Sequence, residues 1–136
     1  MTVVHIHGTS GINKSDRTCR KKQFRQVFKN LGDGQPGANG RINMIFGDFN
    51  TDPHRLDWLD KSARYLQVTA AKHGFKFHTG ENSSELRTFR GLVSIDHVLS
   101  DHFQGSCTFP GVTPGTEPVL RESYFDHAPV LCTLSR

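Results

Sequence analysis

The alternation of apolar and polar positions predicts a chain that mixes strands and helices. Apolar runs of strand length occur at residues 2–7, 41–46, 93–100 and 129–134, and shorter ones occur at 75–78, 87–89 and 105–109. Runs of about four to eight such residues, bounded by glycine-rich or polar segments, are typical of buried or half-buried strands. We therefore expect a sheet built from segments spread over the whole chain.

Two segments show helical periodicity instead. Apolar residues recur at i, i+3, i+4 and i+7 at positions 24, 27, 28 and 31. This spacing predicts a helix from about residue 17 to residue 31, with Asp16 as its cap. A second helical region, one helix or two, is expected over residues 53–61 and 63–73. Pro53 opens it and Gly74 ends it.

Polar residues occupy particular places at the ends of the predicted strands. Asp48 and Asn50 follow the strand 41–46 at i and i+2, so an extended chain would turn both side chains to one face. A carboxylate and an amide at a strand end suit a hard cation and a phosphate oxygen. On this segment alone, a polar turn that merely ends a strand explains the pattern equally well.

Three motifs in a fixed order resemble those of the endonuclease/exonuclease/phosphatase superfamily, whose fold is DNase I-like. The motifs are Gly-Asp-Phe-Asn at 47–50, Ile-Asp-His-Val at 95–98 and Asp-His-Ala-Pro-Val at 126–130. The segment 2–7 is similar to the family's strand that ends in a catalytic-site histidine. The resemblance covers nearly the whole chain and corresponds to the C-terminal half of the family domain. It implies a single domain, residues 1–136, of the α/β (α+β) class: half of a DNase I-like β-sandwich, with a mainly antiparallel sheet and helices on one face.

The resemblance implies that Asp48 and Asn50 act on the phosphate and its attacking water. Asp48 matches the acid that positions or deprotonates the water, and Asn50 matches the amide that holds the phosphate. His7 matches a histidine that acts as a general acid in DNase-like members. Phosphodiester cleavage needs such groups, because a base must generate hydroxide and another group must help the leaving oxygen.

The resemblance also implies a metal site beside a histidine. Asp126 matches an acid that helps the metal site, and His127 matches a histidine that contacts the scissile phosphate. Asp96 matches the acid that hydrogen-bonds this histidine and fixes its tautomer. The implied cofactor is Mg²⁺ or Mn²⁺, with Asp126 and Asp48 as metal residues. His97 should point to the opposite face of its strand and is expected to be structural.

Positive charge is concentrated in one predicted helix. The net charge is +4, but residues 14–29 carry seven basic side chains against one acidic side chain. Lys22, Arg25 and Lys29 share one face, which is either a solvated surface or a surface that contacts phosphates. Arg20 and Gln23 fit an Arg-x-x-Gln pattern of the family. We therefore expect Arg20, Lys22, Arg25 and Lys29, together with Asn50, to bind substrate.

These observations favour a metal-dependent phosphoester hydrolase, with a nuclease acting on DNA or RNA as the first candidate. The alternative is a catalytically weak or inactive module of the same family that binds nucleic acid or a protein. Fold does not fix the substrate, so the phosphoester itself stays open. Three cysteines without metal-ligand spacing are expected to be reduced thiols. Reduced cysteines and the absence of a secretory signal predict a cytoplasmic protein, and we expect no membrane span.

Half a sandwich leaves one apolar sheet face open to water, which globular proteins avoid. Members of the family are longer, and their first half supplies the covering strands and a metal-binding glutamate that has no counterpart here. A second copy, the rest of a longer protein or a rearrangement of the strands would cover the face. Of these, we expect a homodimer.

Overall fold

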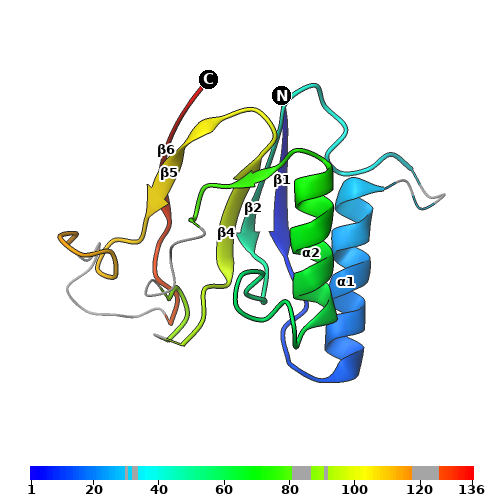
Figure 1. The fold of residues 1–136 in the computed structure, drawn as a ribbon, viewed down its shortest axis with the longest axis horizontal. Coiled ribbons are helices and arrows are strands. Elements are labelled where there is room, and N and C mark those ends of the chain that lie inside the picture. Colours follow the sequence, from blue (N-terminus) through cyan, green and yellow to red (C-terminus); the bar gives the residue numbers. More distant parts are fainter. Residues whose placement is uncertain (30, 32–33, 81–86, 91, 118–125) are drawn as a thin grey trace.

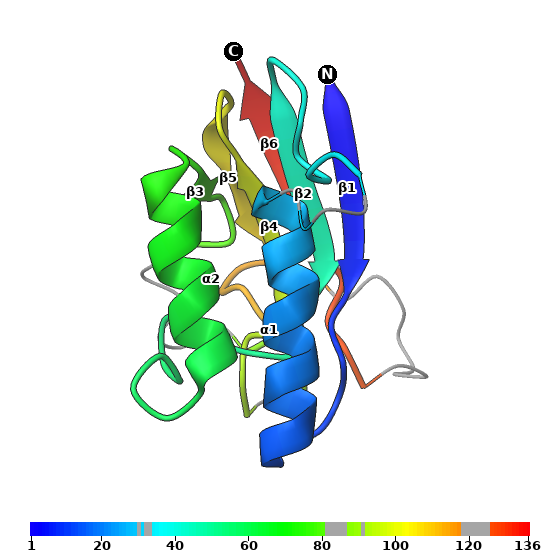
Figure 2. The same ribbon diagram turned by 90° about the vertical axis from the view of Figure 1, so that its right-hand side faces the viewer.

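The computed structural model describes residues 1–29, 31, 34–80, 87–90, 92–117 and 126–136. Within these ranges, two helices cover one face of a four-stranded sheet, and a two-stranded sheet lies on the other side (Figures 1 and 2). The elements are β1 (Thr2–His7), α1 (Lys14–Phe28), β2 (Asn43–Asp48), α2 (Lys61–Lys72), β3 (Lys76–Phe77), β4 (Asp96–Ser100), β5 (Gln104–Thr108) and β6 (Leu131–Ser135). None of the described helices is long and apolar enough to cross a membrane.

The larger sheet has the strand order β1-β2-β4-β3. β1 and β2 are parallel, whereas β4 is antiparallel to both β2 and β3, and β5 pairs antiparallel with β6. The predicted character of the sheet, mainly antiparallel with helices on one face, is therefore confirmed. Ile6, Ile45 and Leu99 point from the sheet toward the helices and are buried against α1 and α2. Each such side chain contributes about 1.5–3 kcal/mol by leaving water.

The predicted start and end of the first helix are wrong. Asn13, and not Asp16, caps α1: its side chain accepts a hydrogen bond of 2.9 Å from the Asp16 backbone N–H. Asp16 instead lies in the first turn, where a carboxylate is favourable at the positive end of the helix dipole. The helix ends at Phe28, because Lys29 adopts an extended conformation.

The prediction of helix over residues 53–61 is also wrong, because this segment forms successive turns. The buried carboxylate of Asp52 accepts hydrogen bonds from the backbone N–H groups of His54 and Arg55, both at 3.1 Å. Such a side chain offers the backbone an alternative to the helix. α2 begins only at Lys61, capped by the carboxylate of Asp60. The predicted end of this helix at Gly74 is confirmed, and Gly74 has a φ of 76°.

The strand predicted to stop at Gly47 continues to Asp48. Gly47 has a φ of 134°, and a Cβ atom at this position would collide with the carbonyl oxygen of Ile6 on β1. Glycine is therefore required here for β1 and β2 to stay paired as far as the candidate site.

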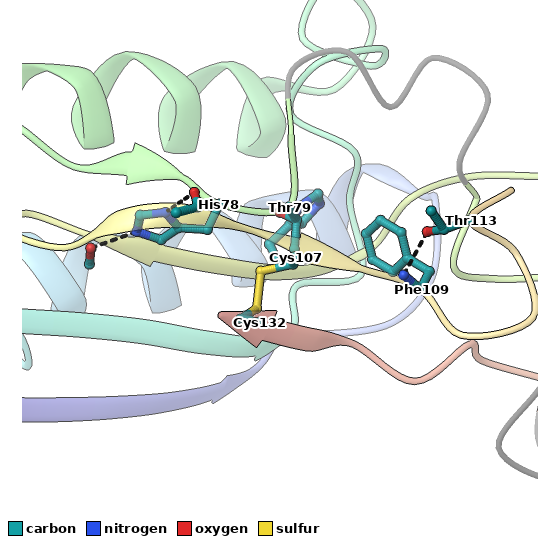
Figure 3. The surroundings of a disulfide bond; sticks show 9 residues. His78, Thr79, Cys107, Phe109, Thr113 and Cys132 are labelled. Atoms are coloured by element: carbon teal, nitrogen blue, oxygen red, sulfur yellow. Dashed lines mark hydrogen bonds between the residues drawn. A yellow bond between two sulfur atoms is a disulfide. The ribbon is translucent and has the colours of Figure 1, made fainter. Parts of the chain in front are cut away.

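The predicted reduced state of the cysteines is wrong for two of them, because Cys107 and Cys132 form a disulfide (Figure 3). The two residues face each other in the register of β5 and β6, which their 25-residue separation in sequence does not indicate. The Cys107 backbone N–H also donates to the carbonyl of His78, and His78 is bonded to Ser100 of β4. The two-stranded sheet is thus linked to the end of the larger one. Cys19 is a free, exposed thiol on α1.

A second copy of the chain is expected to cover the sheet face away from the helices. On this face Val3 of β1 is 49 % exposed and Phe46 of β2 is 37 % exposed, whereas Ile45 on the helical face is 1 % exposed. We predict a dimer in light scattering at micromolar concentration and a monomer after Val3→Lys or Phe46→Lys. Val68→Lys, on the outer face of α2, is the matched control. A well-folded wild-type monomer would contradict the prediction.

Candidate active site

Three of the predicted site residues lie in one row across the end of the larger sheet. Asp48 of β2 pairs in register with His7 of β1 on one side and with Asp96 of β4 on the other. Alternation along each strand turns all three side chains to the face away from the helices. Two carboxylates and an imidazole from separate segments of the chain therefore converge at one end of the sheet.

Asn50 holds the Asp48 carboxylate in place. The Asn50 backbone N–H donates to Oδ1 of Asp48 at 2.7 Å, and its Nδ2 donates to Oδ2 at 2.9 Å. The same Nδ2 donates to the carbonyl of Gly8, so Asn50 also ties the end of β2 to the loop after β1. Asn50 adopts a left-handed conformation with a φ of 50°, which asparagine tolerates better than most residues. If Asn50 held a phosphate through Nδ2, as the resemblance implies, Nδ2 would have to give up its hydrogen bond to Asp48 or to Gly8.

His7 lies on the solvent side of Asp48. Its Nε2 is 3.6 Å from Oδ2 of Asp48, and its side chain is 72 % exposed. Gln23 of α1 donates to the backbone carbonyl of His7 at 3.5 Å and accepts from Thr9. The position leaves the imidazole accessible to a ligand while the backbone beneath it is fixed.

Asp96 and His127 make the contact that the resemblance implies. Oδ2 of Asp96 is 2.9 Å from Nδ1 of His127, and both side chains are partly buried. When Asp96 is ionised, its carboxylate accepts a hydrogen bond from Nδ1–H of His127, which leaves Nε2 as the ring nitrogen that can contact a ligand. Burial raises the pKa of Asp96 above its usual value, and the nearby Asp48 charge adds to the rise, while hydrogen bonds from His127 and Thr88 oppose it.

Thr88 joins the two halves of this pair and was missed by sequence reasoning. Its buried hydroxyl oxygen accepts hydrogen bonds from the backbone N–H groups of Ile95 and Asp96, at 2.9 and 3.2 Å. Its backbone carbonyl accepts from Ala128, the neighbour of His127, at 2.6 Å. A threonine in a short apolar run carries no signal of such a role. The predicted strand 87–89 is only a pair of isolated bridges, from Phe89 to Val93 and to His127.

Asp126 lies at the rim of the site. Its Oδ2 is bonded to Nη2 of Arg90 at 3.2 Å, and its Oδ1 is 4.0 Å from Nε2 of His127. Over the part of the chain that the structure describes, no group of three or more His, Cys, Asp or Glu side chains is arranged to hold a metal ion. The carboxylates nearest to His127 thus come from Asp96, which holds its Nδ1, and from Asp126, which is paired with an arginine.

Arg20 does not fit the substrate-binding role predicted for it, because it is only 1 % exposed. Its guanidinium donates to Asp60 at 2.7 Å, to Ser62 at 2.9 Å and to the carbonyl oxygens of Thr9 and Gly11. Burial acts to raise the pKa of Asp60, but hydrogen bonds from Ser62, Arg20 and Thr51 outweigh it and lower the pKa. Removing one member of such a buried pair costs about 3–5 kcal/mol. Arg20 therefore fixes the loop after β1 rather than a ligand.

Lys22, Arg25 and Lys29 are exposed on or just beyond α1, as predicted, but the structure does not bring them together with the carboxylates. The helices cover the face of the sheet opposite to His7, Asp48 and Asp96. α1 begins at the end of the sheet where the site lies and runs toward the opposite end (Figure 1). Lys29, which follows the last turn of the helix, is therefore far from the row.

No protein-family model matches the chain, and no curated protein matches it in sequence. Among solved structures, it resembles the mannosyl-6-phosphatase of Bacteroides thetaiotaomicron, with a TM-score of 0.53 and 19 % identity, over 98 % of this chain and 50 % of the phosphatase. The fold is DNase I-like. The predicted fold class is thereby confirmed, and at this identity the likeness concerns the fold alone.

A second similar structure is the cytolethal distending toxin of Actinobacillus actinomycetemcomitans, with a TM-score of 0.48 and 19 % identity, over 98 % of this chain and 48 % of the toxin. The chain spans about half the length of each of these two proteins.

Proposed function

We propose that the chain is a metal-dependent phosphoester hydrolase, with DNA or RNA as its substrate. The observation that carries the proposal is the hydrogen bond of 2.9 Å between Asp96 and His127, because Asp96 also pairs in register with Asp48. A histidine oriented by one carboxylate, beside a second carboxylate held by an amide, provides the groups that phosphoester cleavage requires. The DNase I-like fold is in keeping with this chemistry.

Each side chain has a separate task in the proposed reaction. Asp48 accepts a proton from the attacking water and orients it, and Asn50 keeps its carboxylate in place. With both ring nitrogens protonated, His127 donates its Nε2–H to a phosphate oxygen and its Nδ1–H to Asp96. His7, exposed and 3.6 Å from Asp48, gives a proton to the leaving oxygen.

The donor set fits Mg²⁺ or Mn²⁺ of the kind that is bound by few protein ligands. Mg²⁺ is usually held by one or two carboxylates, with waters and substrate phosphate oxygens completing its shell. Asp48 and Asp126 are the carboxylates that would hold it, and both present hard oxygen donors. When bound, the ion would neutralise the charge that develops on the phosphate.

The alternative is a catalytically weak or inactive module that binds nucleic acid or a protein. It is favoured by the pairing of Asp126 with Arg90, which occupies one of the two candidate metal carboxylates. The two proposals differ in turnover rather than in binding. We expect release of product from DNA, RNA or a small phosphodiester with Mg²⁺ or Mn²⁺. Tight binding of an oligonucleotide without any metal-dependent turnover would favour the module.

Charge reversal on α1 tests the choice of nucleic acid. The triple change of Lys22, Arg25 and Lys29 to Glu should weaken oligonucleotide binding, because each cation that pairs with a phosphate releases a counterion. The slope of log affinity against log salt should fall by about one for each such cation that is removed. Lys72 and Lys76, exposed on other elements, provide a control pair of Lys→Glu changes. Equal affinity in the triple variant and in the wild type would show that this face is solvated surface.

A further inference from the structure

Trp58 and Leu59 form an exposed apolar pair on the turns that connect β2 to α2. The Trp58 side chain is 79 % exposed and that of Leu59 is 51 % exposed. Trp58 is also the one tryptophan of the chain. Exposing two adjacent large apolar side chains costs hydrophobic free energy, which is commonly offset at a binding site.

Hydrogen bonds hold the segment that carries these two exposed side chains in place. The indole Nε1 of Trp58 donates to the carbonyl of Arg55 at 3.1 Å, so the ring is fixed on its own turn. Arg17 of α1 donates to the carbonyl of Leu59 at 3.0 Å. The two ends of the segment are anchored by the buried carboxylates of Asp52 and Asp60. An aromatic ring held rigidly in water loses little conformational entropy when a ligand stacks on it.

Cations and a second aromatic ring continue this surface along the line where α1 and α2 meet. Nζ of Lys21 lies 5.4 Å from the centre of the Tyr65 ring, and Lys21 is one helical turn from Arg17. Lys61, at the start of α2, is exposed. We call this set of residues the α1–α2 seam: Arg17, Lys21, Trp58, Leu59, Lys61 and Tyr65. Of the acidic residues next to it, Asp60 is buried and paired with Arg20, whereas Asp57 precedes Trp58 and is partly exposed, so the three cations of the seam face one accessible carboxylate on these turns.

We propose that the α1–α2 seam binds single-stranded nucleic acid, with one unpaired base stacked on Trp58 and neighbouring phosphates paired with Arg17, Lys21 and Lys61. The positive charge of the seam requires an anionic partner, and its fixed aromatic ring requires a partner with flat apolar faces. A single strand presents both, whereas a duplex keeps its base faces stacked. This inference rests on the proposed function and specifies its substrate as single-stranded.

The seam has a direct connection to the candidate active site. The chain leaves the site through Asp48 and Asn50 and reaches Trp58 along the same segment before α2 begins. In Figure 1 this segment, between β2 and α2, lies at the end of the sheet where β1 and β2 finish. A strand whose phosphate lies at His127 would therefore continue over this end of the molecule toward Trp58.

Because the chain has one tryptophan, its fluorescence reports on the seam alone. In EDTA, where turnover is excluded, oligothymidylate should quench the emission of Trp58, and an abasic oligomer of equal length should bind without quenching. A fully paired duplex should quench much less. Emission that shifts with vesicles of phosphatidylserine and phosphatidylcholine, but not with oligothymidylate, would overturn the proposal in favour of a lipid surface.

Variants separate stacking from charge and from catalysis. Trp58→Ala should weaken oligothymidylate binding about 5- to 100-fold, whereas Trp58→Phe should retain most of it. Ile12→Ala, which removes another exposed apolar side chain, is the control. Trp58→Ala should leave turnover of a small phosphodiester unchanged and raise KM for the oligonucleotide. Unchanged oligonucleotide binding in Trp58→Ala would refute the seam even if the small phosphodiester is hydrolysed. Absence of that hydrolysis in the wild type would instead refute the proposed function.

Discussion

Asp48→Asn and His127→Ala should each lower metal-dependent turnover by about 10²- to 10⁴-fold, the usual effect of losing an acid–base group. Asp48→Asn removes the carboxylate that Asn50 holds in place, so the attacking water loses its base. His127→Ala removes the imidazole that Asp96 orients. The measurement is the initial rate of phosphodiester hydrolysis at saturating Mg²⁺.

Folding must be excluded as the cause of these losses. His102→Ala, at an exposed residue between β4 and β5, is the control and should keep wild-type turnover. Thermal unfolding of each variant should stay cooperative, because Asp48 is the last residue of β2, His127 lies outside the strands, and neither belongs to the buried core. Turnover at the wild-type level in both site variants would mean that the row is not the active site.

The free energy of unfolding should fall as the pH is lowered from about 6.5 to about 4, and His97 should account for much of the fall. Burial lowers the pKa of His97 from 6.5 to about 4. Between these values the unfolded chain binds a proton at His97 that the folded chain does not, so acid favours unfolding. The shift corresponds to roughly 3 kcal/mol over the whole window.

Urea unfolding of the wild type and of His97→Gln at pH 7 and pH 4.5 would measure this effect. The variant will be less stable at both pH values, because it disturbs the ring packing against Phe49 and Phe77 and the bonds to Thr79 and Ser94. The diagnostic quantity is the difference between the two pH values, which should be smaller in the variant. His102→Gln should keep the wild-type difference. An equal pH dependence in His97→Gln and the wild type would contradict the role assigned to His97.

The contact between Asp96 and His127 could be anticipated because Ile-Asp-His-Val at 95–98 and Asp-His-Ala-Pro-Val at 126–130 resemble family motifs in which this acid and this histidine are hydrogen-bonded. His97 was also correctly expected on the opposite face, and it is buried among aromatic rings. The face to which a strand side chain points depends only on its position along its own strand, so it can be predicted without knowing the neighbouring strands. The row of His7, Asp48 and Asp96 additionally needed the register of three strands, which only the structure supplies.

The errors share a physical cause, which is competition from tertiary contacts. Arg20 was expected to bind substrate because its spacing matched a motif, yet its side chain reaches Asp60, forty residues away in sequence. Asp52 accepts a hydrogen bond from the backbone N–H of Ser94, forty-two residues away in sequence, and its carboxylate also bonds the backbone that follows it, which gives turns in place of the predicted helix. Cys107 and Cys132 meet only because β5 and β6 pair in one register. None of these partners can be chosen from the spacing of residues alone.

Hydrolysis of a small phosphodiester and of a single-stranded oligonucleotide, measured with Mg²⁺, with EDTA and after Mg²⁺ is restored, tests the central claim most directly. We predict release of product that stops in EDTA, returns with Mg²⁺ and is absent in Asp48→Asn. No product from the wild type under any of these conditions, or product that persists in both EDTA and Asp48→Asn, would contradict the claim.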